Sequence, residues 1–305
     1  MTTADTFAYD RVTTVGDYLA LLKPRVMSLV VFTGLAGIIA APGHVHPLTA
    51  FTALLCIAIA AGASGALNMA YDSDIDRLMS RTARRPIPMG HVAREEALAY
   101  GWSLSAMSVA MMWLFVNALA ASLLAFTVFF YVVVYTLGLK RRTPQNIVIG
   151  GLSGALPPAI GWAAVTGHLS LAPLVLVAII FMWTPPHFWA LSLWISKDYA
   201  NAGVPMLPVV KGKRVTRNHI LAYTILLAPL GVVPAFIGLG GMIYLITSAS
   251  MGFWMLLEAF ATWREKDEIK EPSAKRLFGV SLLYVFVPFG ALIVERLLSV
   301  PPLWT

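Results

Sequence analysis

The apolar run LTAFTALLCIAIAAGASGALNM (48–69) passes directly into the polar stretch AYDSDIDRLMSRTARRPIP (70–88). The first run is long enough to cross a bilayer as a helix, which takes roughly 20 apolar residues. Asn68, Asp72 and Asp76 then recur every four residues, so on a helix they share one face. The sequence therefore predicts a membrane helix whose polar end carries two carboxylates and an amide oxygen.

This oxygen-bearing face suits a hard divalent cation such as Mg²⁺, which prefers oxygen ligands and keeps some of its waters. Asp74 falls on the opposite side of the same helix and is left out of the predicted site. Arginines at the same four-residue spacing form a predicted second row beside the acids: Arg77, Arg81 and Arg85. Guanidinium groups beside a carboxylate-bound metal are what a diphosphate needs. The alternative to a metal site is a cytoplasmic loop whose charges only set the membrane topology. That alternative accounts for the arginines but not for the acids, which contribute little to topology.

The composition places the rest of the chain in a membrane. Of its 305 residues, 58% are hydrophobic and only 12% are charged, whereas a soluble domain is nearer a quarter charged. The single cysteine, Cys56, excludes a disulfide framework and a cysteine-based metal cluster. The polar N-terminus has no short apolar core followed by a cleavage site, so no signal peptide is expected.

Nine apolar runs are candidate transmembrane helices, and the basic residues orient them. The runs are approximately 25–42, 48–69, 95–116, 118–138, 146–166, 171–194, 218–238, 240–261 and 277–299. All of the 22 Lys and Arg residues except Arg296 fall before the first run or in every second connection. The positive-inside rule then puts the N-terminus and these connections in the cytoplasm. It also accounts for the net charge of +7 without nucleic acid, which would need a basic soluble face.

The fold class predicted from these runs is an all-α membrane protein with nine transmembrane helices. We expect residues 1–24 to be a cytoplasmic N-terminal segment, residues 25–299 to form one nine-helix domain, and residues 300–305 to be a short extracytoplasmic tail.

Three further groups of polar residues lie in or near the cytoplasmic connections. Lys140 and Arg141 follow Tyr135 and are candidates to contact phosphate, although snorkelling cations at a helix end give the same pattern. Asp198 completes the metal site if its connection meets the first one, and otherwise pairs with Lys197 or another basic neighbour. His187 lies well inside a span, where an ionisable residue is a functional candidate by default. A buried neutral histidine donating to a carbonyl is the alternative.

The motif Asn68-x3-Asp72-x3-Asp76, followed by Arg81 and Arg84-Arg85-Pro86, resembles the first aspartate-rich motif of the UbiA-type intramembrane prenyltransferases. Three longer strings resemble the branch of that family whose members farnesylate protohaem IX. These strings are YTLGLKRRTPQNIVIGGLSGALPPAIGW (135–162), WTPPHFWALSLW (183–194) and KDYANAGVPMLPVV (197–210). The resemblance covers about residues 20–297, essentially the whole membrane domain.

The resemblance implies a ring of helices around a central cavity that opens to lipid, in a bacterial inner membrane, with the catalytic loops on the cytoplasmic side. It implies farnesyl diphosphate as donor and haem b as acceptor, which is a substrate and not a resident cofactor. The farnesyl group joins a vinyl group, water adds, diphosphate departs, and the product haem O leads to haem A. A haem A synthase is then a candidate partner.

Carried onto this chain, the resemblance and the charge pattern give one predicted site. Mg²⁺ ligands are expected at Asn68, Asp72, Asp76 and Asp198. The catalytic residues are expected to be Asp72, Asp76, Asp198 and Lys140. Diphosphate contacts are expected from Asn68, Arg77, Arg81, Arg85, Lys140 and Arg141. His187 is a candidate to ligate the haem iron or to orient the ring.

One departure and two rival interpretations remain at this point. Many members of the family carry a second acid four residues after the first, but here Ala202 follows Asp198 at that spacing. Either fewer ligands are used, or Asn201 or water fills the place. A prenyltransferase acting on an aromatic acid is the nearest rival. A transporter of a cationic substrate is the rival from another class, and it predicts acids near the midplane of the membrane.

Overall fold

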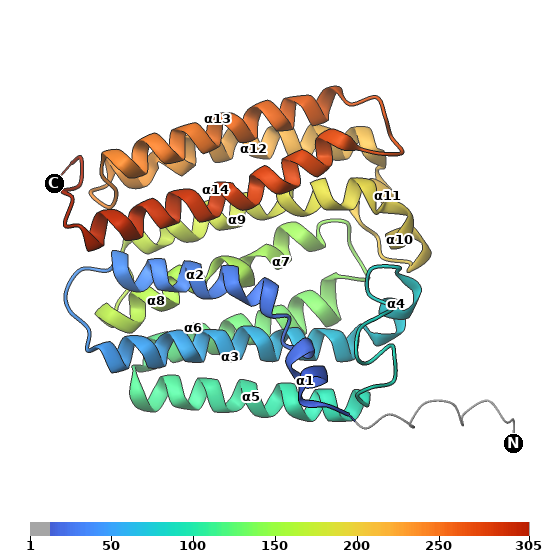
Figure 1. Ribbon diagram of the computed structural model, residues 1–305, viewed down its shortest axis with the longest axis horizontal. Coiled ribbons are helices and arrows are strands. Elements are labelled where there is room, and N and C mark those ends of the chain that lie inside the picture. The colour runs from blue at the N-terminus through green and yellow to red at the C-terminus, as the bar shows by residue number, and fades with distance from the viewer. Residues whose placement is uncertain (1–12, 305) are drawn as a thin grey trace, which may run out of the picture.

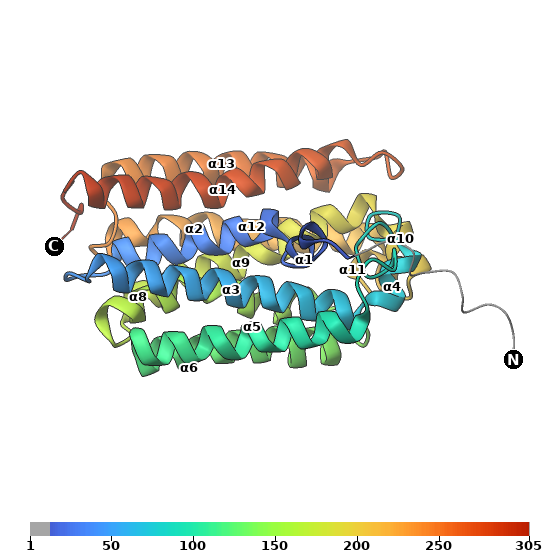
Figure 2. The same ribbon diagram turned by 60° about the horizontal axis from the view of Figure 1, so that its bottom comes forward.

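The protein is an antiparallel bundle of long helices, with its short helices gathered at one end (Figures 1 and 2). The computed structural model describes residues 13–304, and no β-strand occurs among them. The first twelve residues of the predicted cytoplasmic segment therefore lie outside the described part of the chain. The predicted all-α membrane fold is confirmed, because the helices are apolar and long enough to span a bilayer.

The long helices agree closely with the predicted spans. Their bounds are α2 Pro24–Ala40, α3 Pro47–Tyr71, α5 Arg94–Phe115, α6 Ala118–Phe129, η1 Phe130–Leu139, α7 Asn146–Ala155, α8 Pro157–Thr166, α9 Leu171–Trp194, α12 Gly212–Phe236, α13 Met242–Arg264 and α14 Pro272–Leu297. The short helices are α1 Val15–Leu21, α4 Ser73–Leu78, α10 Ser196–Asn201 and α11 Leu207–Val210. Within the described residues, eight helical segments meet the length and hydropathy of a span. The ninth is the pair α1 and α2, which bends by 54°.

Local sequence explains where several spans begin, bend or end. Pro24 and Pro47 stand at the first helical positions of α2 and α3, where a missing N–H costs nothing. Pro157 falls inside the fifth apolar run and divides it into α7 and α8. Gly167 closes α8 in the left-handed conformation, with φ of 70°.

Small residues bring α2 and α8 into close contact at the middle of the bundle. A Cβ atom added to Gly37 would lie 2.1 Å from the carbonyl oxygen of Pro158, and one added to Gly161 would lie 2.2 Å from that of Gly34. Close backbone approach of this kind is how membrane helices associate without a hydrophobic driving force between them. The pair therefore anchors the first span against the fifth.

Inner and outer helices differ in how much of their surface is covered. The spans formed by α3, by α7 with α8, and by α9 are mostly buried, whereas α5, α6 and α13 present most of their side chains to the outside. The last span returns to the start of the bundle, where α14 packs against α2 and α9. A ring around an open cavity and a cytoplasmic N-terminus stay predictions. What matters for function is that α4, α10 and α11 lie together at one end (Figure 1).

Candidate active site

Two connections that are far apart in sequence meet at the end of the bundle that carries the short helices. The Oγ atom of Ser80 donates to Oδ2 of Asp198 at 2.5 Å, joining the segment after α4 to α10. The same two connections and the first turn of α7 also share a small apolar cluster, consisting of Ile75, Met79, Ile147, Tyr199, Ala202, Val204 and Met206. The loops that the sequence assigned to one side of the membrane are therefore packed together.

The predicted oxygen-bearing row exists and is buried. Asn68 is 5% exposed, Asp72 0% and Asp76 2%. Although α3 ends at Tyr71, the helical hydrogen-bond pattern continues through the joint, from Asp72 N to Asn68 O and from Asp76 N to Asp72 O. The Nδ2 atom of Asn68 donates to Oδ2 of Asp72 at 2.6 Å. The four-residue spacing thus places the three side chains on one continuous face.

Cations from three different segments pair with this row. Lys140 donates to Oδ2 of Asp72. Arg85 donates to Oδ2 of Asp76 at 2.6 Å. Lys23 donates to the amide oxygen of Asn68 at 2.7 Å. Because two buried carboxylates lie among three cations, the row forms a strongly polar site rather than a set of isolated surface charges.

Sequence reasoning missed Lys23, whose role shows only in its backbone conformation. Lys23 is the N-cap of α2, immediately before Pro24, and it takes the left-handed conformation with φ of 53°. Such a backbone conformation is uncommon for a residue with a side chain and tends to occur at functional sites. In the sequence it looks like one more basic residue at a helix end. The bend between α1 and α2 is what turns it toward Asn68.

A π-helix positions Lys140 and adds one further member to the site, Thr136. In η1 the carbonyl of Tyr135 accepts from the N–H of Lys140, five residues later. Thr136, which is also buried, accepts from Nδ2 of Asn68 at 3.2 Å and donates to the carbonyl of Tyr131. Stretches of π-helix are rare and are frequent at functional sites. Here the wider turn brings Thr136 and Lys140 to the oxygen-bearing row.

The predicted row of arginines is wrong in its geometry. The helix that was expected to carry Arg77, Arg81 and Arg85 ends at Leu78, and Met79 is extended. The chain then turns back, so Arg85 reaches Asp76 from outside the helix. Arg81 and Arg77 are both exposed, and Arg81 lies beside Tyr199, where its guanidinium opposes the burial that raises the pKa of that phenol.

Asp74 and Arg141 form a separate pair on the outer side of α4. Two guanidinium nitrogens of Arg141 donate to Oδ2 and Oδ1 of Asp74 at 2.7 and 2.6 Å. This pairing lowers the pKa of Asp74 to about 2 and raises that of Arg141. The side chain of Asp74 is 62% exposed, whereas that of Asp72 is 1% exposed. Asp74 therefore lies outside the buried row, and Arg141 stands at its rim, 3.7 Å from Oδ1 of Asp72.

The buried row has the chemistry that a divalent cation requires. Oδ1 of Asp72 is buried and accepts no hydrogen bond from the described residues, and its ion pair with Arg141 is long, at 3.7 Å, so this oxygen can bind an ion. The other donors in the row are amide and carboxylate oxygens, which are the ligands of Mg²⁺. The acids alone do not converge: the described residues contain no cluster of three His, Cys, Asp or Glu side chains that could hold a metal. Asp198 therefore does not complete the site with Asp72 and Asp76 in this structure.

His187 lies in α9 at the contact with α14. It is 7% exposed. Its Nδ1 atom lies 2.7 Å from the hydroxyl oxygen of Ser281. The rings of Trp183 and Phe278 stack on it, with centroids 4.4 and 4.5 Å away. The alternative interpretation, a buried histidine that donates to a carbonyl, is met in its burial, but the partner of Nδ1 is a side-chain hydroxyl.

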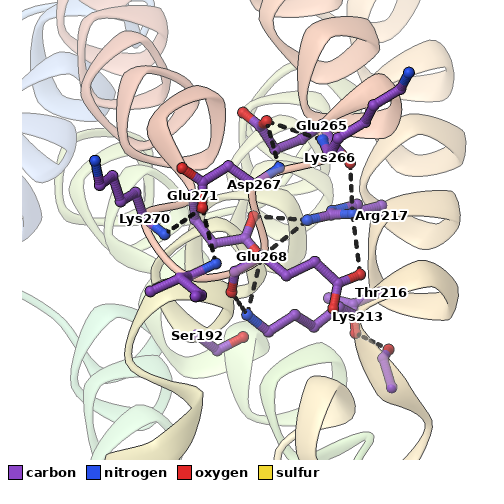
Figure 3. Close-up of polar contacts among 12 residues, drawn as sticks. Ser192, Lys213, Thr216, Arg217, Glu265, Lys266, Asp267, Glu268, Lys270 and Glu271 are labelled. Atoms are coloured by element: carbon purple, nitrogen blue, oxygen red, sulfur yellow. Dashed lines mark hydrogen bonds and ion pairs between the residues drawn. The ribbon is translucent and has the colours of Figure 1, made fainter.

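A second buried group of charges has a structural explanation. Figure 3 shows Arg217 and Lys213 of α12 converging on Glu271 at the start of α14. Arg217 donates to both carboxylate oxygens of Glu271 at 2.9 Å and to the carbonyl of Glu265 at 2.8 Å. Glu271 is 0% exposed and has φ of 46°. The paired charges tie the connection between α13 and α14 to α12.

The comparisons with known proteins place this architecture in one family. The model of the UbiA prenyltransferase family matches residues 29–283. The chain belongs to the UbiA prenyltransferase family. Solved structures agree on the fold. A UbiA homologue from Archaeoglobus fulgidus bound to DMAPP and Mg²⁺ is 18% identical with a TM-score of 0.70, covering 91% of this chain and 99% of that one. The apo structure of a UbiA homologue from Aeropyrum pernix K1 has a TM-score of 0.69 at 21% identity, covering 90% of this chain and 98% of that one.

Relatives that match almost the full chain define the branch within the family. A protoheme IX farnesyltransferase of Parvibaculum lavamentivorans is 58% identical over 93% of this chain and 89% of its own length. A protein of the same name from Azorhizobium caulinodans is 59% identical over 92% of each chain, and one from Cereibacter sphaeroides is 56% identical over 93% of each. The branch that the three sequence strings indicated is therefore confirmed.

Proposed function

We propose that this protein transfers the farnesyl group of farnesyl diphosphate to a vinyl group of haem b, with addition of water, to give haem O and diphosphate. The observation that carries the proposal is sequence identity: more than half of the aligned residues are identical to those of protoheme IX farnesyltransferases, over nearly the whole chain. The buried row of carboxylates and cations provides a physical basis for the first half of the reaction.

Ionisation of an allylic diphosphate requires stabilisation of its leaving group. Lys23, Lys140 and Arg85 already surround the buried oxygen-bearing row and are positioned to bind diphosphate oxygens. Arg141, at the rim, would add a planar donor group that suits phosphate. Preorganised charges of this kind can contribute several kcal/mol each where water is excluded.

Mg²⁺ fits the oxygen donors of this row. Asn68, Asp72 and Asp76 would hold it, and Asp198 is a further ligand if its connection moves inward. When bound, the ion would neutralise the charge that develops on the leaving diphosphate. The protein's own cations would then hold the diphosphate, and its buried side chains would keep water from the farnesyl carbon until the acceptor is in place.

The bonds of the overall reaction balance without a redox partner. The bond between farnesyl C1 and the diphosphate oxygen breaks, and a carbon–carbon bond forms with the terminal vinyl carbon. The remaining vinyl carbon, electron-poor beside the porphyrin ring, takes the oxygen of water, and one proton is released. The product carries a hydroxyethylfarnesyl chain, which makes this a step toward haem A.

The proposed setting is a bacterial inner membrane, with the loop end of the bundle in the cytoplasm. Every second connection carries the basic residues, as the positive-inside rule requires. Direct transfer of the product to a haem A synthase is a further proposal. The rival interpretation as a transporter has less support, because the buried acids Asp72 and Asp76 lie at the junction of α3 with α4 and within the short helix α4, and not in the middle of a span.

The test uses the purified full-length protein with Mg²⁺, farnesyl diphosphate and haem b. Release of diphosphate together with a farnesylated haem supports the proposal. Removal of Mg²⁺ by chelation should stop both, and restoring the ion should recover them. Turnover of a phenolic acid with no product from haem b would instead identify the protein as a prenyltransferase of aromatic acids.

A further inference from the structure

The hydrogen bond between His187 and Ser281 selects one form of the imidazole ring. The hydroxyl of Ser281 lies 2.7 Å from the carbonyl oxygen of Phe278, which can only accept. A hydroxyl has a single proton, so the Ser281 oxygen meets Nδ1 of His187 with a lone pair. Nδ1 then carries the ring proton, and Nε2 carries an unshared electron pair.

The unshared pair on Nε2 has no hydrogen-bond partner among residues 13–304. The hydrogen bond at Nδ1 is the one that the ring makes within this part of the chain. The histidine itself is 93% buried, since only 7% of its surface is exposed. A buried, neutral imidazole with a free Nε2 and a hydrogen-bonded Nδ1 is the arrangement found in histidines that bind a metal.

Two aromatic rings also restrain the orientation of the His187 imidazole. Trp183 stacks on it and donates its indole N–H to the backbone carbonyl of Ser281 at 2.6 Å. Phe278 stacks on it from α14. Rotating the His187 ring would therefore break its hydrogen bond to Ser281 and its stacking on Trp183 and Phe278. Such restraint is more than a packed core histidine needs, and it is what a precisely placed ligand requires.

We infer that Ser281 is a positioning residue that presents Nε2 of His187 to the iron of the porphyrin acceptor. The inference rests on the proposed function, since haem b is the iron-bearing molecule in that reaction. His187 lies seven residues before the end of α9, about 10 Å along the helix axis. The ligand would therefore hold the porphyrin inside the apolar part of the bundle, below the loops that carry Asp72 and Asp198.

The first experiment reads the iron itself and does not depend on turnover. Ferric and ferrous haem b are bound to the detergent-purified full-length protein, and absorption and resonance Raman spectra are recorded. The wild type should show a histidine-ligated iron. His187→Gly should lose that signature and regain it with added imidazole. An unchanged spectrum in His187→Gly overturns the inference, whereas haem O formation by the wild type would still uphold the proposed function.

The second experiment separates positioning from packing. Ser281→Ala should lower haem affinity by about 10- to 100-fold, the usual effect of removing a partner of a metal-bound histidine, and should shift the iron–histidine stretching band. Ser281→Thr, which keeps the hydroxyl, should restore the band. Ser105→Ala is the matched control, because Ser105 is buried and its hydroxyl donates to the carbonyl of Gly101 within the same helix.

Iron-free protoporphyrin IX provides the last comparison. The wild type and Ser281→Ala should bind the iron-free porphyrin with equal affinity, because this porphyrin offers no iron to His187. An equal loss of affinity for haem and for the iron-free ring would show that Ser281 only supports packing, and would overturn the inference.

Discussion

Replacing Asp72 with Asn should abolish ion binding while leaving the fold intact. Oδ2 of Asp72 accepts from both Asn68 and Lys140, and Oδ1 is buried without a hydrogen bond. In the Asp72→Asn protein, the amide oxygen would turn toward the two donors, and the NH₂ group would take the place of Oδ1. A donor would then stand where the ion needs an acceptor.

The expected loss of transition-state stabilisation follows from the removal of one preorganised charge in a buried site. Removing such a group typically costs about 2.7–4 kcal/mol, which corresponds to about 10²- to 10³-fold in kcat. Asp74→Asn is the matched control, because its side chain is 62% exposed. Its ion pair with Arg141 is a surface pair worth about 0–1 kcal/mol, so activity should fall by no more than about fivefold.

The assay measures farnesylated haem by chromatography, and Mn²⁺ binding in the absence of haem. Thermal unfolding in detergent checks that both variants are folded. The reasoning would be refuted if Asp72→Asn kept more than a tenth of wild-type kcat, or if Asp74→Asn lost more activity than Asp72→Asn.

Three further predictions concern the cations and the packing. Lys23→Met should raise KM for farnesyl diphosphate and weaken inhibition by free diphosphate by about tenfold or more, because a charged donor to the anion is lost. Unchanged inhibition by diphosphate would show that Lys23 is not part of the diphosphate site. Glu271→Gln should lower the free energy of unfolding by about 3–5 kcal/mol, since it leaves buried cations unpaired. Glu258→Gln breaks a pair whose arginine, Arg276, is 57% exposed, and should cost less than about 1 kcal/mol. An equal loss in both variants would contradict the explanation. Gly37→Val should impair folding, measured as yield of monodisperse protein, because its Cβ would overlap the Pro158 carbonyl.

The spans were predictable because lipid imposes strict requirements on a chain. Only a helix satisfies its own backbone across an apolar layer, so length and hydropathy suffice to place it. The sixth predicted span, 171–194, has the same bounds as α9. The first span was less clear, since α2 has 17 residues and depends on the bent joint with α1.

The site was predictable only where its residues follow one helical repeat. The row from Asn68 to Asp76 came from four-residue spacing, which the continuous hydrogen-bond pattern preserves. The arginine row failed because the same spacing was carried past Leu78, where the helix ends. Lys23 and Thr136 could not be found this way, because a helix bend and a π-helix bring them to the row from 45 and 68 residues away.

The identity of the acceptor is the central claim, and mass spectrometry of the haem after turnover tests it most directly. Purified protein is incubated with Mg²⁺, farnesyl diphosphate and haem b, and the molecular mass of the extracted haem is measured. The account predicts a haem heavier by one farnesyl group and one hydroxyl group, formed in equal amount to the diphosphate released. Diphosphate release with unchanged haem b would contradict it.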